Sequence, residues 1–557
     1  MSASGTGSPA TLADALAEAA RGGEGLTFLE RDGEVRLPYR QLRVDAARIA
    51  SALAARGVGT GDRVVLALPT GAAFARHWFA AVHLGAVPCV QPSPRAHATL
   101  EVGASRLQEV VDLLRARLVI TGPEERARWG ASLRRVGMFD AVEDVGAWPP
   151  APAVARGAHD TALIQATSGS TAGPKCIALS HENVLANCAQ IDDRIGRRNG
   201  GTGLGWVPMF HDLGLIGIFL YPLCRGRGSV LMSPARFMRR PSAWLESIST
   251  HRAVLSTAPN FGLRHVIDRV AEKDIADLDL SSWKALVCGG ERVDPDTLNE
   301  FASKLAPAGF DRRALVPGYG LAEATLCVSL SSPRSDFTVE QRACGTDMGA
   351  ARCTSGRAGT VGPATVGCGP PVERTRVEVI DELGEPVPEG VPGRILVSGP
   401  SVMQGYLGPD GAVMTRPEGE PLDTGDVGYL RGGELFVVGR AKEVIIIRGQ
   451  NRFPTEFEAA AREVAACARM RFLAIGVPCP VAGEAVHLVG ERADAARAGD
   501  VDGDERLART VARHVASRTG VLPARVSFVP RRTLPLTTSG KIRRRAFREA
   551  YLKGAPA

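Results

Sequence analysis

Short apolar runs alternate with segments of helical periodicity as far as about residue 330 of this 557-residue chain. For example, the run from Arg63 to Leu68 follows a glycine turn and precedes a helical segment from Phe74 to Leu84. Strands that are buried on both faces are continuously apolar, and helices connect them in parallel. The alternation therefore predicts an α/β fold of layered, mainly parallel sheets. Because 45% of the residues are hydrophobic, the chain can bury large cores between such layers.

The alternation breaks at a segment from Ser331 to Gly367, which is rich in Gly, Arg, Thr and Cys and has no clear period. We predict that this segment is an irregular insertion. Strand patterns resume at residues 376–380 and 393–397, and a further strand-helix pattern begins near Lys442. The pattern divides the chain into a large N-terminal domain, residues 1–440 with 331–367 as the insertion, and a small C-terminal domain, residues 441–557.

Charge and composition exclude several classes of protein. The net charge of +7 is modest for this length, Lys and Arg are scattered, and only 5% of the residues are aromatic, so we expect no nucleic-acid binding. Apolar runs are too short for a membrane span and no secretory signal is evident, so we expect a soluble, cytoplasmic protein. The eleven cysteines occur singly, which favours buried thiols. The closest group, Cys344, Cys353 and Cys368, leaves a metal site or a disulfide open.

The nine residues from Thr167 to Lys175 carry four hydroxyl groups, two glycines and one lysine. Such a loop can turn hydroxyls, backbone N–H groups and an ammonium group toward a polyanion. It is not a Walker A loop, because strand-like residues follow Lys175 in place of Ser or Thr at the start of a helix. The flanking patterns predict a loop between two strands that folds over a triphosphate. By itself, such a composition is more often that of a mobile linker.

Four further motifs follow in a fixed order. They are Tyr-Gly-Leu-Ala-Glu-Ala-Thr at 319–325, Thr-Gly-Asp at 424–426, Gly-Arg at 439–440 and Thr-Ser-Gly-Lys at 538–541. Each is weak alone, but all five motifs together resemble the adenylate-forming superfamily of acyl-CoA synthetases, luciferases and peptide-synthetase adenylation domains. The runs at 205–217, 258–261 and 445–454 resemble the fatty acyl-AMP ligase branch, and the resemblance covers about residues 25–550.

This resemblance implies a large N-terminal domain of layered α/β subdomains and a small mobile C-terminal α+β domain that pivots at a hinge, Lys442. It implies that the insertion packs against the small domain and hinders the rearrangement that CoA transfer requires. It also implies ATP and Mg²⁺ as cofactors. The catalytic residues that it assigns are Lys541, Glu323, Lys175 and His211, with Glu323 as the metal ligand. The nucleotide-binding residues that it assigns are Thr167, Ser168, Gly169, Ser170, Thr171, Gly289, Gly290, Glu291, Tyr319, Gly320, Thr325, Asp426 and Arg440.

In this assignment the loop holds the β- and γ-phosphates, Tyr319 offers a flat face to adenine, and residues 289–291 form the opposite edge. Asp426 accepts the ribose hydroxyls, and Lys541 places its ammonium group between the carboxylate and the α-phosphate. Because two anions must meet, preorganised donors supply much of the barrier reduction, about 3–4 kcal/mol for each well-placed donor. Two simpler interpretations stay open, namely that Tyr319 is an ordinary core aromatic and that His211 is structural.

The substrate pocket is the least specific part of the assignment. We predict that five apolar residues form a hydrophobic acyl pocket, although any core has the same composition. These residues are Phe210, Ile216, Phe219, Phe237 and Phe261.

The leading hypothesis is ATP-dependent activation of a carboxylic acid, fatty or otherwise apolar, to acyl-AMP with release of pyrophosphate. The acyl group then passes to the phosphopantetheine thiol of a separate acyl carrier protein, since no carrier signature occurs in the sequence. The alternatives are an acyl- or aryl-CoA synthetase, or a ligase that uses an amine or another nucleophile. An amino-acid-activating domain is disfavoured, because His211 stands where such domains carry the aspartate that anchors the amine. The intact charged residues of the motifs disfavour a non-catalytic adenylate-binding module.

Overall fold

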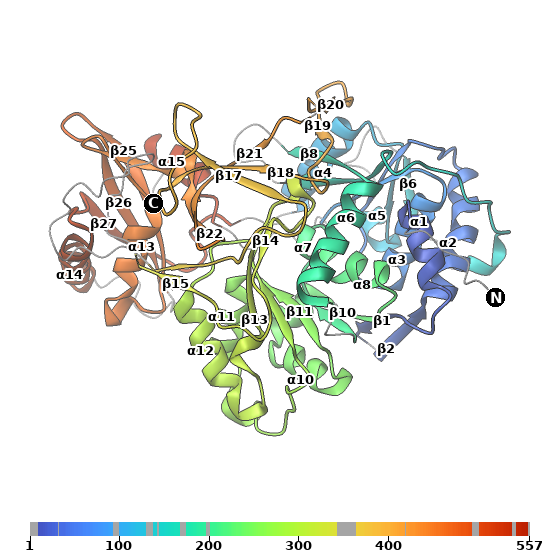
Figure 1. Cartoon of the computed structure of the whole chain (residues 1–557), viewed down its shortest axis with the longest axis horizontal. Coiled ribbons are helices and arrows are strands. Elements are labelled where there is room, and N and C mark those ends of the chain that lie inside the picture. Colours follow the sequence, from blue (N-terminus) through green and yellow to red (C-terminus); the bar gives the residue numbers. More distant parts are fainter. Residues whose placement is uncertain are drawn as a thin grey trace.

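Two mixed sheets of eight strands each are the largest sheets in the described part of the chain (Figure 1). The computed structural model describes residues 9–31, 33–92, 100–129, 137–141, 144–167, 174–196, 201–341, 364–417, 419–492, 501–536 and 542–554. The first sheet has the strand order β14 (Ser329–Leu330), β13 (Leu315–Tyr319), β12 (Ala285–Cys288), β11 (Leu255–Ala258), β9 (Gly203–Gly205), β10 (Ser229–Met232), β1 (Gly25–Glu30) and β2 (Gly33–Pro38). Neighbouring strands from β13 to β1 are parallel, and the edge strands β14 and β2 are antiparallel.

The second sheet is parallel on one side and antiparallel on the other. Its strand order is β20 (Val413–Thr415), β19 (Gly405–Leu407), β8 (Lys175–Ser180), β7 (Thr161–Thr167), β4 (Val87–Val90), β3 (Arg63–Leu66), β5 (Leu118–Thr121) and β6 (Gly137–Asp140). Strands β7, β4, β3, β5 and β6 are parallel to one another, whereas β7, β8, β19 and β20 are joined by antiparallel pairing. The two strands that flank the hydroxyl-rich loop therefore form an antiparallel hairpin within a mainly parallel sheet.

Helices cover both sheets and share a core with them. They are α1 (Leu12–Ala19), α2 (Tyr39–Ala54), α3 (Ala72–His83), α4 (Leu100–Leu114), α5 (Pro123–Trp129), α6 (His181–Ile191), α7 (Asp212–Gly214), α8 (Tyr221–Cys224), α9 (Pro234–Arg239), α10 (Ser242–His251), α11 (Asn260–Arg269) and α12 (Pro295–Leu305). On α2, Leu42, Ala46, Ile49 and Leu53 recur at helical spacing and are buried. They belong to a core that includes residues of β1 and β3, from both sheets. The predicted layered α/β architecture is confirmed.

A four-stranded antiparallel sheet follows the two large sheets. Its order is β17 (Arg376–Ile380), β18 (Gly393–Ser398), β21 (Leu422–Arg431) and β22 (Glu434–Arg440). The insertion is more regular at its base than its composition predicts, because β15 (Val339–Glu340) pairs with β16 (Thr365–Val366). Residues 342–363, with Cys344 and Cys353, lie outside the described residues. Cys368 is a buried free thiol, and burial raises its pKa to about 12.

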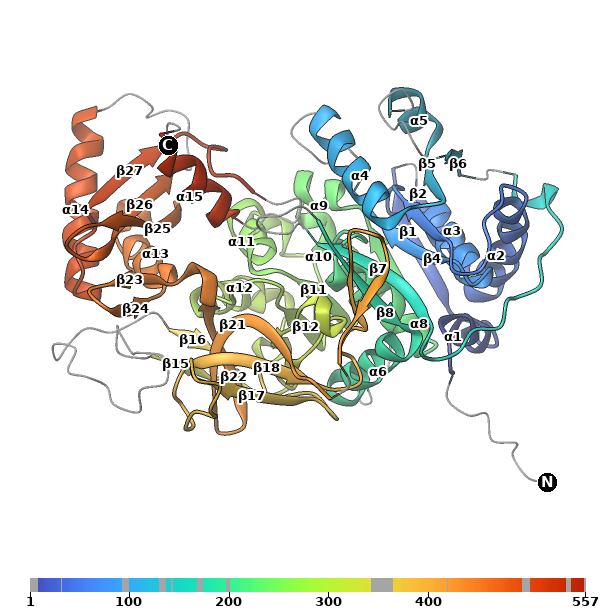
Figure 2. The ribbon, with the colours of Figure 1, turned by 90° about the horizontal axis from the view of Figure 1, so that it is seen from above.

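The chain after Arg440 forms a separate sheet with the order β24 (Gln450–Arg452), β23 (Ile445–Ile447), β26 (Gly483–Glu491) and β25 (Arg471–Cys479), and β27 (Arg525–Val529) pairs with β26. Three helices pack on this sheet: α13 (Pro454–Arg462), α14 (Val501–Thr519) and α15 (Arg544–Leu552). Its two core clusters contain only residues from Ile445 onward. Figures 1 and 2 show this C-terminal unit at one end of the molecule and the N-terminal helices α1 and α2 at the other. Within the described ranges, no helix is both long and apolar enough to span a membrane.

Candidate active site

The hydroxyl-rich loop is held at the end of a hairpin. Thr167 is the last residue of β7 and pairs with Lys175, the first residue of β8. The predicted position between two strands is confirmed for these flanking residues, whereas residues 168–173, including Ser168, Gly169, Ser170 and Thr171, lie outside the described part of the chain. Lys175 is exposed, and its Nζ lies 4.7 Å from the ring centroid of Tyr406. This geometry allows a cation–π contact.

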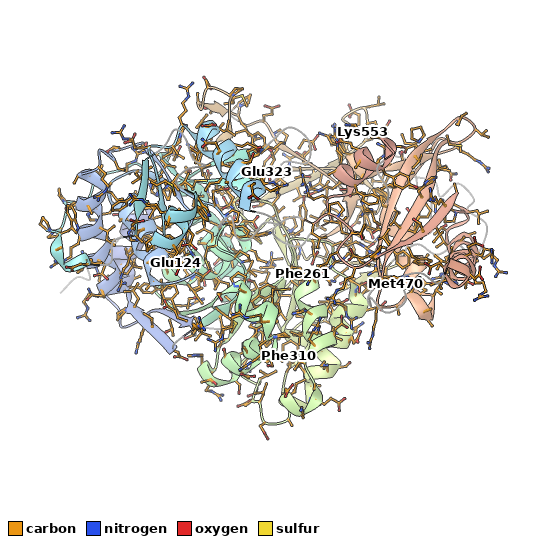
Figure 3. All side chains as sticks on the ribbon, turned by 180° about the vertical axis from the view of Figure 1, so that it is seen from behind. Glu124, Phe261, Phe310, Glu323, Met470 and Lys553 are labelled. Carbon is orange, nitrogen blue, oxygen red and sulfur yellow. The ribbon has the colours of Figure 1, made fainter. Side chains whose placement is uncertain are left out.

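Tyr406 connects this hairpin to Glu323. Tyr406 lies on β19, which pairs with β8, and its hydroxyl donates a hydrogen bond to Glu323 Oε1 over 2.8 Å. Burial and the nearby carboxylate raise the pKa of the Tyr406 hydroxyl, so that it stays a proton donor at neutral pH. Glu323 lies on a short 3₁₀ turn, Ala322–Ala324, after β13. Figure 3 shows Glu323 in the middle of the molecule, between the N-terminal sheets and the C-terminal unit. Tyr406 was not among the residues predicted from the sequence.

The residue after this turn has a strained backbone. Thr325 adopts φ 68° and ψ −62°, and the N–H of Leu326 donates to the carbonyl of Ala324 over 2.8 Å. This is a classic γ-turn, which is rare for a β-branched residue and costs about 1–3 kcal/mol. The Thr325 side chain is fully buried, and its hydroxyl donates to the carbonyl of Ser401 over 2.7 Å. This hydrogen bond fixes the turn after Glu323 and uses the donor of the Thr325 hydroxyl, while the assignment of Thr325 to the nucleotide stays a prediction.

Tyr319, Asp426 and Arg440 come together from three strands. Tyr319 ends β13, and its hydroxyl donates to Asp426 Oδ2 over 2.7 Å. Asp426 on β21 is directly opposite Arg440 on β22, and Arg440 Nε lies 3.2 Å from Asp426 Oδ1. The Asp426 side chain is only 9% exposed, whereas that of Arg440 is 63% exposed. A buried carboxylate thus faces an accessible guanidinium, and each carboxylate oxygen retains capacity to accept a further hydrogen bond.

The environment of Asp426 perturbs its ionisation. Burial raises the pKa of its carboxyl above the ordinary value of 3.8, and Arg440 and the Tyr319 hydroxyl partly offset this effect. Burial and the Asp426 charge also raise the pKa of Tyr319. The pair therefore consists of a carboxylate that accepts hydrogen bonds and a phenol that donates one. The Tyr319 hydroxyl is committed to this polar pair, and its role toward adenine stays a prediction.

Tight backbone packing surrounds this cluster. Gly320 leaves no room for a side chain, since a Cβ there would lie 1.6 Å from the carbonyl oxygen of Leu326. Gly289, Gly290 and Glu291 follow β12, Gly290 has φ +79°, and Glu291 accepts the N–H of Phe261 over 2.7 Å. His211 caps α7, and its Nδ1 lies 2.5 Å from Asp212 Oδ1. A Cβ on Gly290 would lie 3.6 Å from the imidazole Cε1 of His211, so His211 borders the 289–291 turn.

An apolar cavity of about 560 Å³, including its part open to solvent, adjoins the cluster. Tyr319 and the glycines 289, 290, 318 and 320 border it, and its apolar wall includes Ile191, Ile195, Leu213, Leu255, Val287 and Leu326. One wall is a helix that begins as α7, continues through a π-helical turn at Leu215–Leu220 and ends as α8. π-Helical turns occur frequently at functional sites.

The apolar set predicted for the acyl pocket lies elsewhere. Phe219 packs against Phe74, Trp78 and Phe79, and Ile216 is fully buried in the same core. Phe237 stacks on Trp206 at a centroid distance of 3.7 Å, Phe261 contacts the same ring edge-on, and the backbone of Phe210 binds Gln165. None of the five lines the 560 Å³ cavity as far as the described residues define it. These residues stabilise the layers that hold the cavity.

The predicted hinge lies where the chain leaves β22 for the C-terminal unit. Lys541 and the rest of the 538–541 motif are outside the described residues, and Leu536 and Ile542, the described residues before and after them, form a β-bridge. Lys442 is exposed on a 3₁₀ turn, Ala441–Glu443, directly after β22. Glu443 of this turn accepts from Arg544 on α15 over 3.1 Å. The turn is thus attached to the C-terminal unit through an ion pair and to the large unit through β22.

Fold and site together combine layered α/β sheets with a buried carboxylate, a guanidinium beside it and an adjoining apolar cavity. The AMP-binding enzyme family matches residues 16–407. Three relatives are 30–32% identical to this chain. They are a Caulobacter vibrioides protein provisionally named acyl-CoA synthetase (32%, 98% of this chain and 96% of the relative), the long-chain-fatty-acid–AMP ligase FadD26 of Mycobacterium marinum (32%, 94% and 94%), and the medium-chain-fatty-acid–[acyl-carrier-protein] ligase JamA of Moorena producens (30%, 93% and 90%).

A solved structure from a study of fatty acyl-adenylate ligases of E. coli and L. pneumophila has a TM-score of 0.87 and 31% identity, and covers 98% of each chain. The chain belongs to the AMP-binding enzyme family, in the branch of the fatty acyl-AMP ligases. It is an adenylate-forming ligase, and enzymes of this kind use ATP.

Proposed function

We propose that this enzyme activates a medium- to long-chain fatty acid as acyl-AMP and transfers the acyl group to the thiol of a separate carrier protein. The observation that carries the proposal is the position of Tyr319. Its side chain borders the apolar cavity, and its hydroxyl binds Asp426 beside Arg440. A nucleotide bound at the polar cluster and an acyl chain in the cavity would meet at this one residue.

In the proposed complex, Asp426 accepts hydrogen bonds from the ribose hydroxyls and Arg440 lies beside the nucleotide. Tyr319 presents its ring to adenine, with the 289–291 turn on the other side. Thr167, Lys175 and the intervening loop hold the β- and γ-phosphates. A carboxylate oxygen of the acid attacks the α-phosphorus, the bond from that phosphorus to pyrophosphate breaks, and acyl-AMP forms. Lys541 stabilises the negative charge of both reactants at this step.

Glu323 is the proposed ligand of Mg²⁺. Among the described residues, no three His, Cys, Asp or Glu side chains are grouped to hold a metal ion. A single carboxylate nevertheless suits Mg²⁺, which is often bound by one or two carboxylates together with substrate phosphates and water. The ion would neutralise charge on the phosphate oxygens. The hydrogen bond from Tyr406 fixes one oxygen of Glu323 and leaves the other available for the ion.

For the second half-reaction, we propose that a phosphopantetheine thiolate attacks the acyl carbonyl carbon, so that a thioester forms and AMP leaves. The carrier-protein ligase among the relatives supports a carrier as the acceptor, and the provisionally named acyl-CoA synthetase supports coenzyme A as the rival acceptor. Both acceptors share the adenylation step, so pyrophosphate exchange does not separate them.

The test combines two measurements on the full chain. ATP–pyrophosphate exchange with a panel of carboxylic acids should show activity with fatty acids, and exchange should stop in EDTA and return with added Mg²⁺. Product analysis with coenzyme A or a holo-carrier protein, each at equal concentration, should give thioester on the carrier. The absence of exchange with every acid would refute the adenylation assignment. Formation of a thioester on coenzyme A but not on the carrier protein would refute the carrier protein as the acceptor.

A further inference from the structure

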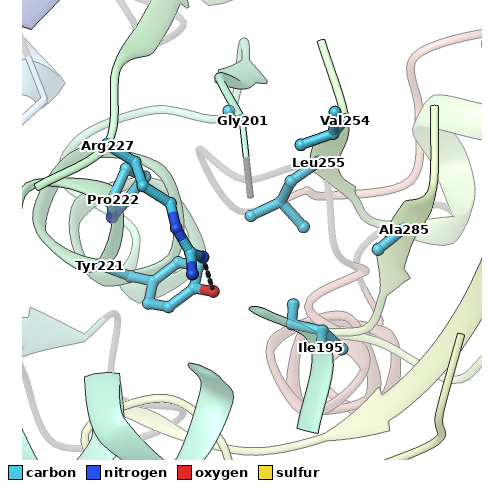
Figure 4. Close-up of a pocket in the computed structure, with 9 residues that line it drawn as sticks. Ile195, Gly201, Tyr221, Pro222, Arg227, Val254, Leu255 and Ala285 are labelled. Carbon is cyan, nitrogen blue, oxygen red and sulfur yellow. Dashed lines mark hydrogen bonds between the residues drawn. The ribbon is translucent and has the colours of Figure 1, made fainter. Parts of the chain in front are cut away.

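The apolar cavity extends along strand β12, away from the proposed nucleotide end. Ala285 and Val287 are two residues apart on this strand and therefore share a face of the sheet, and Gly289 follows directly after the strand. Val287 and Gly289 line the 560 Å³ cavity. Ala285 lines a second cavity of about 300 Å³, including its part open to solvent (Figure 4). The second cavity thus continues the first toward the start of β12.

The helical wall of the cavity follows the same order. Leu213, Gly217 and Tyr221 are four residues apart, a spacing that places residues on one side of a helix. All three line the 560 Å³ cavity, but only Tyr221 of these three also lines the second cavity. His211, two residues before Leu213, borders the 289–291 turn. The helix therefore begins near the nucleotide end, and Tyr221 lies at the far end.

Tyr221 lies at the boundary between the two cavities. Ile195, Tyr221 and Leu255 line both of them, and Tyr221 has the largest side chain of the three (Figure 4). Leu255 is paired in register with Gly203 on one neighbouring strand and with Ala285 on the other. The sheet beyond the boundary therefore carries small residues, and the ring of Tyr221 lies between this space and the acyl cavity.

The ring of Tyr221 is held in place through its hydroxyl group. This hydroxyl donates to Asp192 over 3.1 Å and accepts from Arg227 over 3.0 Å, as Figure 4 shows for Arg227. The Arg227 guanidinium also lies 2.9 Å from Asp192, and the Tyr221 residue is only 1% exposed. Displacement of the ring by a longer chain would break both hydrogen bonds in a buried site, where such a loss is costly.

The two walls give the length of the cavity up to Tyr221. The four-residue step from Gly289 back to Ala285 spans about 13 Å at the strand rise of about 3.3 Å per residue. The eight-residue step from Leu213 to Tyr221 spans about 12 Å at the helical rise of about 1.5 Å per residue. Since an extended chain advances about 1.2 Å per bond, such a length holds about ten bonds.

We propose that Tyr221 sets the length of the acyl chain that the enzyme accepts, and that the preferred fatty acids have about eight to ten carbons. The inference rests on the proposed function, since it takes the cavity to hold the acyl chain. Each methylene group buried before Tyr221 strengthens binding about fourfold, because apolar surface is removed from water. A longer chain meets the ring, and its last carbons gain no such burial unless the ring leaves Asp192 and Arg227.

The test measures ATP–pyrophosphate exchange with saturated acids from hexanoate to tetradecanoate. In the unmodified enzyme, kcat/KM should be highest for octanoate or decanoate, and decanoate should exceed tetradecanoate by about tenfold or more. Tyr221→Ala joins the two cavities, so this ratio should fall to about onefold or lower. Tyr221→Phe retains the ring, and the ratio should stay about tenfold or more whatever the overall rate of this variant.

Phe219→Ala is the matched control for the loss of an aromatic ring. Phe219 lies in the same helical wall and is also fully buried, but it packs against Phe74, Trp78 and Phe79. It lines neither cavity as far as the described residues define them. The ratio of decanoate to tetradecanoate in this variant should therefore match that of the unmodified enzyme.

Tyr221→Leu, which keeps more of the packing, replaces Tyr221→Ala if the alanine variant does not fold. Binding of stable acyl-sulfamoyl adenosines, measured by calorimetry on the unmodified enzyme, gives an independent measurement of the length limit. Affinity should rise with chain length up to about the decanoyl compound and then stop rising.

Equal kcat/KM for decanoate and tetradecanoate in the unmodified enzyme, or an affinity that continues to rise to the tetradecanoyl compound, overturns the inference and leaves adenylation intact. An unchanged ratio in a folded Tyr221→Ala or Tyr221→Leu variant also overturns it. A lack of exchange with every acid is a different result, because it refutes the proposed function itself.

Discussion

The hydroxyl of Tyr406 lies 2.8 Å from Glu323 Oε1, while the ring of the same tyrosine lies 4.7 Å from Lys175 Nζ. One side chain thus contacts the proposed metal ligand through its hydroxyl and the lysine of the phosphate loop through its ring. The contact joins residues 83 positions apart and depends on the pairing of β19 with β8. The two charged groups are therefore positioned by the sheet, and not by the loop alone.

Tyr406→Phe should reduce ATP–pyrophosphate exchange about tenfold, because a hydrogen bond to a charged group contributes about 1.5–3 kcal/mol. The ring remains, so that the contact with Lys175 is retained, and the apparent affinity for Mg²⁺ should fall. Tyr406→Leu should cost more, since it removes both contacts. Tyr429→Phe is the control, because the Tyr429 hydroxyl also binds a glutamate, Glu340, but outside the site. Equal exchange in Tyr406→Phe and the unmodified enzyme would show that Tyr406 does not position Glu323.

The raised pKa of Asp426 predicts an acid limit for nucleotide binding. Only the ionised form accepts two ribose hydroxyls, and burial places the folded-state pKa above 3.8. The KM for ATP should therefore begin to rise, as pH falls, at a higher pH than for an ordinary aspartate. Asp426→Asn should raise the KM about 10- to 100-fold at neutral pH, as expected for the loss of charge-assisted hydrogen bonds.

The raised pKa of Asp426 also predicts how stability depends on pH. Low pH weakens nucleotide binding, whereas it favours the folded state at this residue. A carboxyl group whose pKa is raised by folding holds its proton more tightly in the folded state, so its contribution to stability is present below pH 3.8 and is lost as pH rises through the folded-state pKa. Asp426→Asn should consequently not lower the Tm at neutral pH. A lower Tm with an unchanged KM for ATP would assign Asp426 a structural role instead.

Lys541→Ala should reduce pyrophosphate exchange by several orders of magnitude and leave ATP binding and the fold near normal. The reason is that an ammonium group between the carboxylate and the α-phosphate acts only where the two anions meet. Transfer from chemically synthesised acyl-AMP to the acceptor should persist in this variant. Full exchange in Lys541→Ala would remove Lys541 from the adenylation step.

Gly217→Ala should shift the preference toward shorter or slimmer acids. The new methyl group fits, because its nearest contacts are 3.4 Å to Leu326 and 3.6 Å to Thr257, but it occupies space in the cavity. Exchange rates with acids of increasing length should therefore decline earlier in the series than for the unmodified enzyme. An unchanged length profile would place the acyl chain outside this cavity.

Local sequence signals predicted the elements on which the site is built. The helical segment predicted from Phe74 to Leu84 corresponds to α3, and the strand patterns on both sides of the hydroxyl-rich loop correctly indicated β7 and β8. The resemblance based on the motifs assigned Tyr319, Asp426 and Arg440 to one site. In the structure the three side chains are in contact. These features depend on residues near one another in the sequence, or on a family pattern.

The sequence did not reveal features that depend on long-range packing. Tyr406 carries no motif, and only the β8–β19 pairing brings it to Glu323. Phe219 and Phe237 have the composition of a substrate pocket but pack in the cores, since apolarity does not distinguish a cavity wall from a core. The resemblance assigns the motif of Thr325 to the nucleotide, whereas the Thr325 hydroxyl donates to the carbonyl of Ser401 in the structure.

The contacts of β15, at the base of the insertion, indicate a substitution that should change whether the acyl group passes to coenzyme A or to a carrier protein. Glu340 on β15 accepts hydrogen bonds from Tyr429 at 2.9 Å and from Arg431 at 3.1 Å, both on β21, so β15 is attached to the large unit. If the insertion hinders the rearrangement needed for CoA transfer, loosening this attachment should relieve the hindrance. Because Arg431 is 54% exposed, we expect a loss of about 1 kcal/mol of local stability.

Glu340→Ala should therefore raise acyl-CoA formation severalfold, and removal of residues 342–363 should raise it further, while pyrophosphate exchange stays unchanged. The comparison uses equal amounts of each enzyme with octanoate, ATP and coenzyme A, and measures thioester by mass spectrometry. Arg394→Ala is a suitable control, since it removes a surface pair with Asp423 away from the insertion. Rapid acyl-CoA synthesis by the unmodified enzyme would contradict the proposal, because the insertion would then impose no barrier, and it would place the chain functionally with the CoA synthetases.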